Sequence, residues 1–436
     1  MKNSGPKSQP RARSRHRRRG LRIALSLAAL LMAAAVAAHP RCALAMDSAP
    51  VGDREHIAEP WYIAGSQRHM ASIFPSRVVR RSGPVLVLPR AQRDLSAVFY
   101  EWNGRRHSLD ELLARTYTAG FLVIKDGNIV DERYFAGADE NSSFTSWSMA
   151  KSVTSTLVGI AIAEGRISGV DAPVSGYIPE LAGSGYDGVP IRDLLDMSSG
   201  VDFSEVYINP ESTVEKMWWE AMVRETRRLN DFAVSIRRAE PPGTRFAYRS
   251  LDTQVLGWML TRVAGKPLAD YLSEKIWAPL GMEHDAAWLT DRPGPDGMEA
   301  AYCCLNASLR DYGRFGLMIL NRGRLNGREI APERWIREAT RPAAAPMEFG
   351  RLYPGYPLGY GYQWWLLPGP DHAFAAAGIN FQFIYINPAA NLVIVKTSAF
   401  PTPWNTPLEM ETYAAFAAIG HFLTSDANAS GRVVGD

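Results

Sequence analysis

The chain has 436 residues, of which 46% are hydrophobic and 10% aromatic, enough to build a large buried core. Charged residues make up only 21%, and this composition excludes an intrinsically disordered body. The net charge of +3 includes ten Lys or Arg and no acid within residues 1–45, and removing that segment leaves −7. An acidic body argues against nucleic acid as a partner, since phosphate binding depends on a positive surface.

The N-terminus has the pattern of an export signal. A basic run ends at Arg22, and residues 23–38 are apolar and uncharged. Ala43 and Ala45 fit an A-x-A cleavage site, so we predict a signal peptide over residues 1–45 and a periplasmic or secreted protein. The alternative is an uncleaved anchor, but the apolar stretch is shorter than the ~20 residues that span a bilayer. We therefore expect no stable membrane span after cleavage.

The three cysteines predict no disulfide framework. Cys42 lies in the predicted signal peptide, and Cys303 and Cys304 are adjacent, where a disulfide between them would be badly strained. We therefore predict two free, buried thiols that behave as small hydrophobic side chains.

The body begins with residues 46–115, which mix Pro, Arg and aromatic residues without clear periodicity. We expect an irregular N-terminal extension that packs on the rest. Residues 120–125 and 129–134 are β-rich runs joined by Asp126-Gly127-Asn128, a strong hairpin signal. Residues 148–164 then carry apolar side chains all round with small ones between them, which indicates a helix buried within a domain.

Residues 167–346 are mostly helical in pattern, most clearly at 251–264 and 305–320, and predict an all-helical insertion. Strand character returns in three later segments before a closing amphipathic helix, at residues 360–367, 373–387, 392–398 and 410–423. Strands at both ends of the body imply one sheet assembled from distant pieces of the sequence and flanked by helices.

The fold class expected from this order is α/β (α+β), with one domain over residues 116–436. Its sheet lobe comprises residues 116–166 and 347–436, and its helical lobe comprises residues 167–346. A cleft between the two lobes follows from this arrangement.

The most informative short motif is Ser148-Met149-Ala150-Lys151, at the start of the expected buried helix. Residues three apart lie one turn apart on one helix face, so the Ser148 hydroxyl and the Lys151 amine can meet. Burial and the positive helix N-terminus both disfavour a protonated amine, and a desolvated lysine becomes a base that activates a serine. Taken alone, S-x-x-K also occurs by chance, usually as a solvated lysine beside a helix-capping serine.

A second motif, Tyr248-Arg249-Ser250, follows a Pro-Gly turn. Four further stretches accompany it, at residues 194–201 (LLDMSSGV), 279–283 (PLGME), 306–316 (NASLRDYGRFG) and 378–388 (GINFQFIYINP). In this order, and with S-x-x-K, these motifs resemble the serine hydrolases of the class C β-lactamase and D,D-peptidase fold. The details are similar to the 6-aminohexanoate-dimer hydrolase and esterase branch, and the likeness runs from about Gly120 to the C-terminus.

The resemblance implies catalytic roles for four residues. Tyr248 would share a proton with Lys151 and return it to the leaving group, a task that suits a phenol beside an amine. The backbone N–H groups of Ser148 and Ile379 would form the oxyanion hole.

The resemblance also suggests substrate contacts. Tyr207 matches a flap tyrosine of the dimer-hydrolase branch, and Trp365 matches its substrate-lining tryptophan. Asn306 and Gly378 are further candidates. The alternative role for these residues is packing between the lobes.

The family's third element is usually Lys-Thr-Gly on a strand, and the matching place here is Ala376-Ala377-Gly378. The lysine, which in the drug-hydrolysing enzymes helps to hold the antibiotic carboxylate, is absent. The resemblance therefore points to esters or amides without that anion. Lys396-Thr397-Ser398 looks like the missing triplet, but it follows the Pro388 turn and should belong to the next strand.

Other patterns argue against a cofactor or a metal. Residues 183–188 satisfy G-x-G-x-x-G but lack a preceding strand, so we interpret them as a loop. The histidines outside the signal segment are scattered, and His372 is best interpreted as a surface turn residue. We predict no cofactor and no metal.

The sequence thus predicts an exported serine hydrolase that cleaves small-molecule carboxylic esters or linear amides through an acyl-enzyme on Ser148, with no nucleic-acid partner. Two alternatives stay open. One is a β-lactamase or D,D-peptidase that acts on cell-wall peptides, and the other is an inactive relative that binds peptidoglycan or a protein through the cleft. Nothing in the sequence indicates the oligomeric state.

Overall fold

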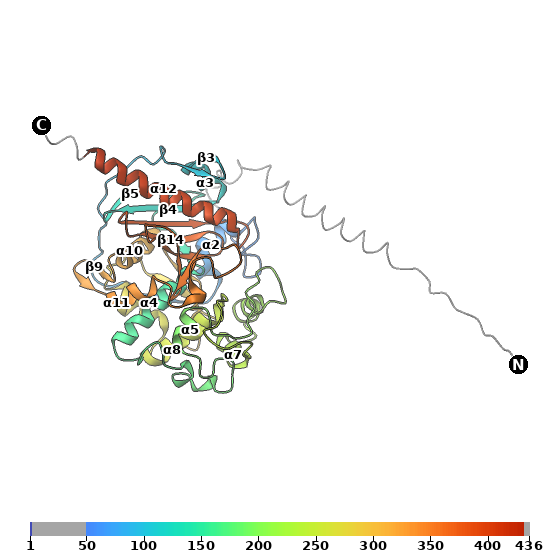
Figure 1. Ribbon diagram of the computed structural model, residues 1–436. Coiled ribbons are helices and arrows are strands. Elements are labelled where there is room, and N and C mark those ends of the chain that lie inside the picture. Colours follow the sequence, from blue (N-terminus) through green and yellow to red (C-terminus); the bar gives the residue numbers. More distant parts are fainter. Residues whose placement is uncertain (2–48, 431–436) are drawn as a thin grey trace. The chain divides into compact units, whose positions relative to one another are not determined.

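The computed structural model (Figure 1) describes residues 49–430 and the isolated Met1. The predicted signal peptide, with Ala43 and Ala45 at its cleavage site, and Cys42 lie outside the described residues. Within the described part, no helix is both long and apolar enough to cross a membrane.

A seven-stranded antiparallel sheet has the strand order β11-β12-β13-β14-β15-β4-β5. Its strands in chain order are β4 (Thr118–Lys125), β5 (Asn128–Tyr134), β11 (Gly359–Gly361), β12 (Trp364–Leu366), β13 (Phe374–Gly378), β14 (Gln382–Asn387) and β15 (Leu392–Ser398). Because β15 pairs with β4, the prediction of one sheet built from distant segments is confirmed. The predicted hairpin is confirmed too: β4 and β5 turn at Asp126 and Gly127, whose φ values of 51° and 77° suit an Asp-Gly hairpin turn.

Helices cover both faces of this sheet (Figure 1). They are α4 (Met149–Ala163) and α10 (Leu309–Leu320) on one face and α12 (Thr406–Ser430) on the other. Successive strand residues point to opposite faces, so Leu122 joins the core with α10 whereas its neighbour Phe121 joins the core on the side of α12. On that side Phe383 packs on Phe416 of α12, with ring centroids 6.0 Å apart. Gly316 lets α10 approach closely, since a Cβ there would lie 2.6 Å from Val393 Cγ1.

The region before β4 is not irregular, and that prediction is wrong. It contains α2 (Ile63–Ile73), β1 (Ser76–Val79), a hairpin of β2 (Phe99–Trp102) and β3 (Arg105–Ser108), and α3 (Leu109–Arg115). The strands have only four residues each, too few to show a period in the sequence. Helix α3 does carry a local signal, because Ser108 and Glu111 form a capping box at its start.

The region of residues 167–346 is not all-helical, which corrects a second prediction. Its α-helices are α5 (Ile191–Leu195), α6 (Thr213–Met217), α7 (Leu229–Ser235), α8 (Ser250–Ala264), α9 (Leu268–Leu272), α10 and α11 (Glu333–Ala339). Four strands interrupt them. Two of these, β7 (Ala286–Leu289) and β8 (Leu305–Ser308), join β1 and β6 (Ser143–Thr145) in a sheet of order β1-β7-β8-β6, and the two-residue strands β9 (Arg324–Leu325) and β10 (Arg328–Glu329) pair with each other. The helix expected from residue 305 begins at Leu309, where the Ser308 side chain accepts a hydrogen bond from Asp311 N.

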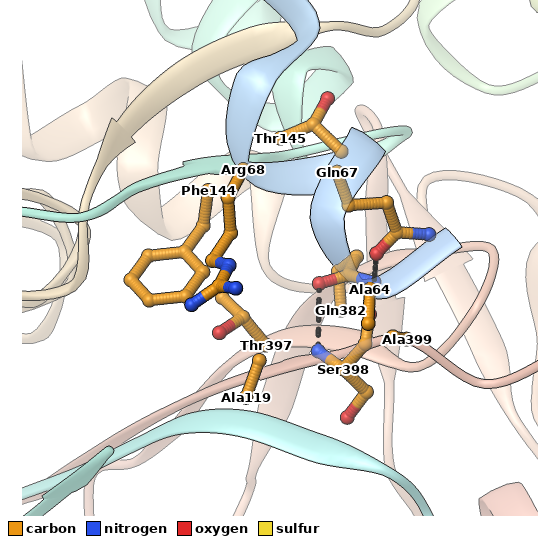
Figure 2. A pocket seen from close by; sticks show the side chains of 10 residues that line it. All are labelled: Ala64, Gln67, Arg68, Ala119, Phe144, Thr145, Gln382, Thr397, Ser398 and Ala399. Carbon is orange, nitrogen blue, oxygen red and sulfur yellow. Dashed lines mark hydrogen bonds between the residues drawn. The ribbon is translucent and has the colours of Figure 1, made fainter. Parts of the chain in front are cut away.

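A small pocket lies beside α2 and the end of β15 (Figure 2). Its lining residues are Ala64, Gln67, Arg68, Ala119, Phe144, Thr145, Gln382, Thr397, Ser398 and Ala399. Four buried polar atoms there have no protein partner: Gln67 Nε2, Arg68 Nε, Thr145 Oγ1 and Thr397 Oγ1. Ordered water normally satisfies such atoms. None of the predicted catalytic residues lines this pocket.

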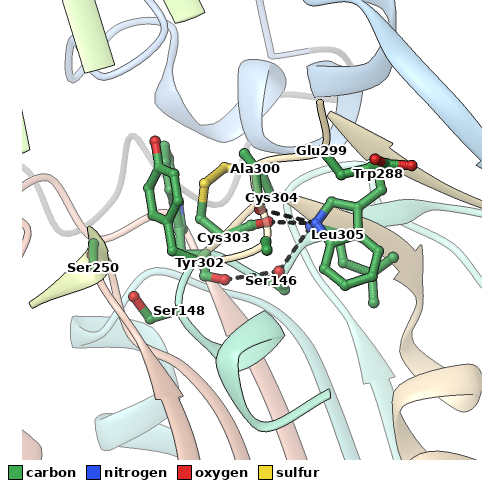
Figure 3. Close-up of a disulfide and its surroundings, with 12 residues drawn as sticks. Ser146, Ser148, Ser250, Trp288, Glu299, Ala300, Tyr302, Cys303, Cys304 and Leu305 are labelled. Carbon is green, nitrogen blue, oxygen red and sulfur yellow. Dashed lines mark hydrogen bonds between the residues drawn. A yellow bond between two sulfur atoms is a disulfide. The ribbon is translucent and has the colours of Figure 1, made fainter. Parts of the chain in front are cut away.

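Cys303 and Cys304 form a disulfide (Figure 3), so the prediction of two free thiols is wrong. Their Cα atoms are 3.7 Å apart, as in any pair of consecutive residues. The longer Cα–Cα distance usual for disulfides describes bridges between residues that are apart in the sequence, so it does not exclude this one. A turn brings the two sulfurs together: Cys303 N donates to Ala300 O at 3.0 Å, and Cys304 has a left-handed φ of 68°. Both residues are buried, as predicted, and the bridge constrains one loop rather than joining distant segments.

Candidate active site

Ser148 stands where β6 leads into α4. The preceding residue, Trp147, has a φ of 42°, a conformation that is uncommon for a residue with a side chain and that turns the chain sharply. Ser148 is then the N-cap residue of α4, with 9% of its surface exposed. The nucleophile candidate therefore lies at the positive end of a buried helix.

Lys151 lies one turn further along α4, with its side chain 1% exposed. Its Nζ donates to Ser148 Oγ at 2.8 Å, to Ser250 Oγ at 3.1 Å and to the carbonyl oxygen of Tyr302 at 2.9 Å. Burial lowers the pKa of Lys151 to about 7, although the Glu205 carboxylate acts in the opposite direction. The amine is therefore in hydrogen-bond contact with the serine hydroxyl and can be neutral near physiological pH.

Tyr248 reaches the same place from the loop before α8. Lys151 Nζ lies 4.8 Å from the centroid of its ring, and its hydroxyl interacts with the Ser148 side chain. Burial raises the pKa of Tyr248 above its ordinary value, and the interaction with Ser148 partly offsets that effect. The backbone N–H of Tyr248 donates to the hydroxyl of Tyr353 at 3.0 Å. Serine, lysine and tyrosine, chosen from two separate sequence motifs, thus meet in one cluster.

Gly378, the last residue of β13, passes very close to the turn that carries Ser148. A Cβ at this position would lie 2.6 Å from Ser146 O and 3.0 Å from Ser148 N, so no larger residue fits without a shift of the backbone. The next residue, Ile379, is partly exposed. Among residues 49–430, neither Ser148 N nor Ile379 N donates a hydrogen bond, so both N–H groups remain free to bind an oxyanion.

The sequence matches the family described as Beta-lactamase over residues 106–418. The chain belongs to the β-lactamase family. A 6-aminohexanoate-dimer hydrolase from Paenarthrobacter ureafaciens is 31% identical over 363 residues, which cover 80% of this chain and 89% of that protein. The homologues are hydrolases of this family, and the chain is a serine hydrolase similar to that enzyme.

Solved structures confirm the β-lactamase-like fold expected from the sequence. A proposed 6-aminohexanoate-dimer hydrolase from Bacillus anthracis superposes with a TM-score of 0.77 at 27% identity, over 86% of this chain and 97% of that one. A family VIII carboxylesterase superposes with a TM-score of 0.55 at 19% identity, over 71% of this chain and 96% of that one, and shows the shared fold.

The segment that the resemblance matches to the third family motif lies on β13, where Ala376 and Ala377 are buried. Lys396-Thr397-Ser398 belongs to β15, so its interpretation as part of another strand is confirmed. The Lys396 amine is fully buried and donates to Ser398 Oγ, and burial lowers its pKa well below the ordinary value. By that resemblance, alanine takes the place of the family lysine, and Lys396 does not replace it on β13.

Of the predicted substrate contacts, Tyr207 and Trp365 lie at the Ser148–Lys151–Tyr248 cluster, whereas Asn306 is held by structural hydrogen bonds. Tyr207 lies beside the cluster, because its hydroxyl donates to Glu205 Oε1 at 2.6 Å. Trp365 is 5% exposed and contacts Tyr248. Asn306 is 3% exposed on β8, and its amide donates to Ala287 O at 3.1 Å and to Cys304 O at 2.9 Å, contacts that account for this side chain structurally.

Two other predicted features lie in turns. Residues 183–188, which satisfy G-x-G-x-x-G, fall outside any helix or strand, as the interpretation of a loop requires. His372 is exposed in the turn between β12 and β13.

Sequence reasoning missed three parts of the site: Glu205, the hydroxyl of Ser250 as a partner of Lys151, and the carbonyl of Tyr302. Glu205 had a weak signal, since it lies two residues before Tyr207, the predicted flap tyrosine. The Tyr302 carbonyl had none, because its position depends on the turn closed by the adjacent disulfide (Figure 3).

Proposed function

We propose that this β-lactamase-family hydrolase cleaves carboxylic esters or linear amides through a covalent acyl-enzyme on Ser148. The observation that carries the proposal is the contact of Lys151 Nζ with Ser148 Oγ at 2.8 Å, in a buried cluster that also holds the hydroxyl of Tyr248. A lysine with a pKa of about 7 has the proton affinity that a base needs at neutral pH.

In the proposed reaction, neutral Lys151 takes the proton of Ser148 as Oγ attacks the substrate carbonyl carbon. The C=O electron pair moves to oxygen, and the N–H groups of Ser148 and Ile379 stabilise the resulting oxyanion. As the tetrahedral intermediate collapses, the C–O or C–N bond to the leaving group breaks and the proton passes to that group through Tyr248. Water then attacks the acyl-enzyme, gives up a proton to the same groups, and releases the acid and Ser148.

Three features support a neutral or cationic substrate with an apolar chain. Glu205 adds a carboxylate next to the cluster, and Ala376 and Ala377 stand where the family places a cation. Exposed apolar side chains lie on segments that reach the site: Val206 beside the flap tyrosine, and Trp404, whose ring lies 6.4 Å from that of Trp365. The relative named 6-aminohexanoate-dimer hydrolase agrees with a net-neutral substrate that has apolar chains, since the linear dimer of 6-aminohexanoate carries an amine at one end, a carboxylate at the other and alkyl chains between them.

We also propose that the protein is exported and acts in the periplasm or outside the cell. The basic and apolar pattern of residues 1–45 supports export, and so does the disulfide between Cys303 and Cys304, since disulfides persist mainly in oxidising compartments.

A substrate panel tests the proposed reaction. Purified protein is assayed with p-nitrophenyl esters of increasing acyl length, with the linear dimer of 6-aminohexanoate and with nitrocefin, and acyl adducts are followed by intact mass spectrometry. We expect turnover of esters or the linear amide, an adduct mass equal to the acyl group, and little nitrocefin hydrolysis. Rapid nitrocefin turnover without ester or linear-amide turnover would assign a β-lactamase instead. No turnover and no adduct from folded protein would indicate a binding protein.

A further inference from the structure

Glu205 is held at the edge of the cluster by three hydrogen-bond donors. Its Oε1 accepts from Ser250 Oγ at 2.6 Å and from the hydroxyl of Tyr207 at 2.6 Å, and its Oε2 accepts from Ser250 N at 2.8 Å. An ionised carboxylate can only accept hydrogen bonds. The single hydrogen of the Ser250 hydroxyl is therefore committed to Glu205, and Ser250 Oγ can only accept from Lys151.

The protonation state of Lys151 determines how many of these three acceptors its amine can serve. A protonated lysine has three N–H bonds and can donate to Ser148 Oγ, Ser250 Oγ and Tyr302 O together. A neutral lysine has two N–H bonds and one lone pair. The Tyr302 carbonyl must accept one of them, and Ser250 Oγ, turned by Glu205, must accept the other. The lone pair is then left facing Ser148 Oγ, which is the direction a base requires.

We propose that Glu205 is a positioning residue that holds the Ser250 hydroxyl as an acceptor toward Lys151 and so directs the lone pair of the neutral amine at Ser148. The inference rests on the proposed function, because it concerns how the base of that reaction is oriented. Without Glu205, the Ser250 hydroxyl is free to rotate and donate to the Lys151 lone pair, in competition with Ser148.

Few charged side chains act on the Lys151 amine. Glu205 is the charged side chain that acts on Lys151, and the other titratable groups nearby are the phenols of Tyr207, Tyr248 and Tyr302. Arg249, next to Ser250, is 3% exposed and pairs with Glu240 at 3.1 Å. Removing the Glu205 charge should therefore lower the pKa of Lys151 further, since burial is left unopposed.

The test is a double-mutant cycle between Glu205→Gln and Ser250→Ala. A glutamine amide has one acceptor oxygen where the carboxylate has two, so it cannot accept from both Ser250 N and Ser250 Oγ as Glu205 does. The rates measured are the second-order rate of inactivation by a fluorophosphonate probe and kcat/KM for a p-nitrophenyl ester. We expect both rates to fall by about 10- to 100-fold in each single variant, as they do when a reacting group is slightly misplaced. In the double variant the rates should fall no further than in the less active of the two single variants. Glu211→Gln is the matched control: Glu211 is in the same loop, its side chain is 85% exposed, and its loss should leave the rates unchanged.

A pH profile separates positioning from loosened structure. In Glu205→Gln the acid limb of the inactivation rate should move to lower pH, whereas a site opened to water would move it higher, toward ordinary lysine. Glu205→Asp, which keeps the charge, replaces Glu205→Gln if that variant does not fold, and should keep the wild-type acid limb with a lower rate.

Three results would overturn the inference: losses that multiply in the double variant, an acid limb that moves upward, or wild-type rates in Glu205→Gln. A failure of the proposed function looks different. In that case the folded wild-type protein would not react with the probe at all, or Ser148→Ala would react as fast as wild type.

Discussion

The ring of Tyr248 stacks on the indole of Trp365, with centroids 5.5 Å apart and planes inclined by 16°. Trp365 belongs to β12 of the central sheet, whereas Tyr248 comes from the loop that begins α8. The sheet therefore fixes the phenol at a place where its hydroxyl meets Ser148. Tyr248 has two separable parts: a ring that packs and a hydroxyl that can carry a proton.

Tyr248→Phe should separate those parts. The ring and its stacking on Trp365 remain, but the hydroxyl that returns the proton to the leaving group is lost. We expect kcat for a p-nitrophenyl ester to fall by about 10²- to 10⁴-fold, the usual contribution of a general acid or base. The thermal unfolding midpoint should change little. Tyr271→Phe, which removes a hydroxyl bonded to Glu164 away from the cluster, is the matched control and should keep full activity. Unchanged kcat in Tyr248→Phe would contradict the role given to the phenol.

The pH dependence of the reaction should report Lys151. Burial lowers its pKa to about 7, and only the neutral amine can accept the Ser148 proton. The value of kcat/KM should therefore rise from acid pH with an apparent pKa near 7 and level off above it. Lys151→Met should lose this limb together with most of the activity. Steady-state rates between pH 5 and 9, corrected for uncatalysed hydrolysis, give the profile, and a limb near the pKa of an ordinary lysine would contradict the assignment.

Gly378→Ala should damage the oxyanion hole. The new methyl group would lie 2.6 Å from Ser146 O and 3.0 Å from Ser148 N, so β13 and the Ser148 turn must move apart. We expect kcat to fall by about 10²- to 10³-fold, as on the loss of one oxyanion donor. Gly176→Ala is the control, because the nearest atom to a Cβ there is 3.9 Å away. Equal activity of the two variants would show that the close approach of Gly378 has no catalytic consequence.

Stability should fall as pH rises through neutrality because of Glu409. This carboxyl is buried among the hydroxyls of Tyr356 and Tyr413, and burial raises its pKa to about 8. In the unfolded chain it ionises near its ordinary value of 4.5, so between that pH and about 8 the native state binds the extra proton. The free energy of unfolding contributed by this group therefore decreases as pH rises across that window.

Glu409→Gln removes this titration and keeps the shape of the side chain. The free energy of unfolding of the variant minus that of wild type should increase from pH 5 to pH 8.5, on the order of a few kcal/mol. Urea unfolding at the two pH values measures the difference. A difference between variant and wild type that is the same at both would contradict the buried, protonated state of Glu409.

The sequence predicts most of the central sheet and the S-x-x-K contact because both depend on local patterns. The period of residues 148–164 is enough to place Ser148 and Lys151 on one helix face, and the Asp126-Gly127 turn fixes the β4–β5 hairpin. The meeting of Tyr248 with Ser148 came from the family resemblance, since no local pattern relates residues so far apart.

The missed features depend on long-range or unusual contacts. Strands β1, β7 and β8 have four residues each and are held mainly by pairing with one another, which a short window of sequence does not reveal. Cys303 and Cys304 bridge because Cys304 adopts a left-handed conformation, a property of the turn rather than of cysteine spacing. Glu205 acquires its contacts only when its loop folds against the start of α8.

The most direct test of the central claim is peptide mapping after reaction with a fluorophosphonate. The protein is labelled to completion, digested and analysed by tandem mass spectrometry, with Ser148→Ala treated in parallel. The account predicts one adduct per chain, located on Ser148, and none in the folded Ser148→Ala variant. An adduct on another residue of the wild-type protein, or labelling that persists in Ser148→Ala, would contradict it.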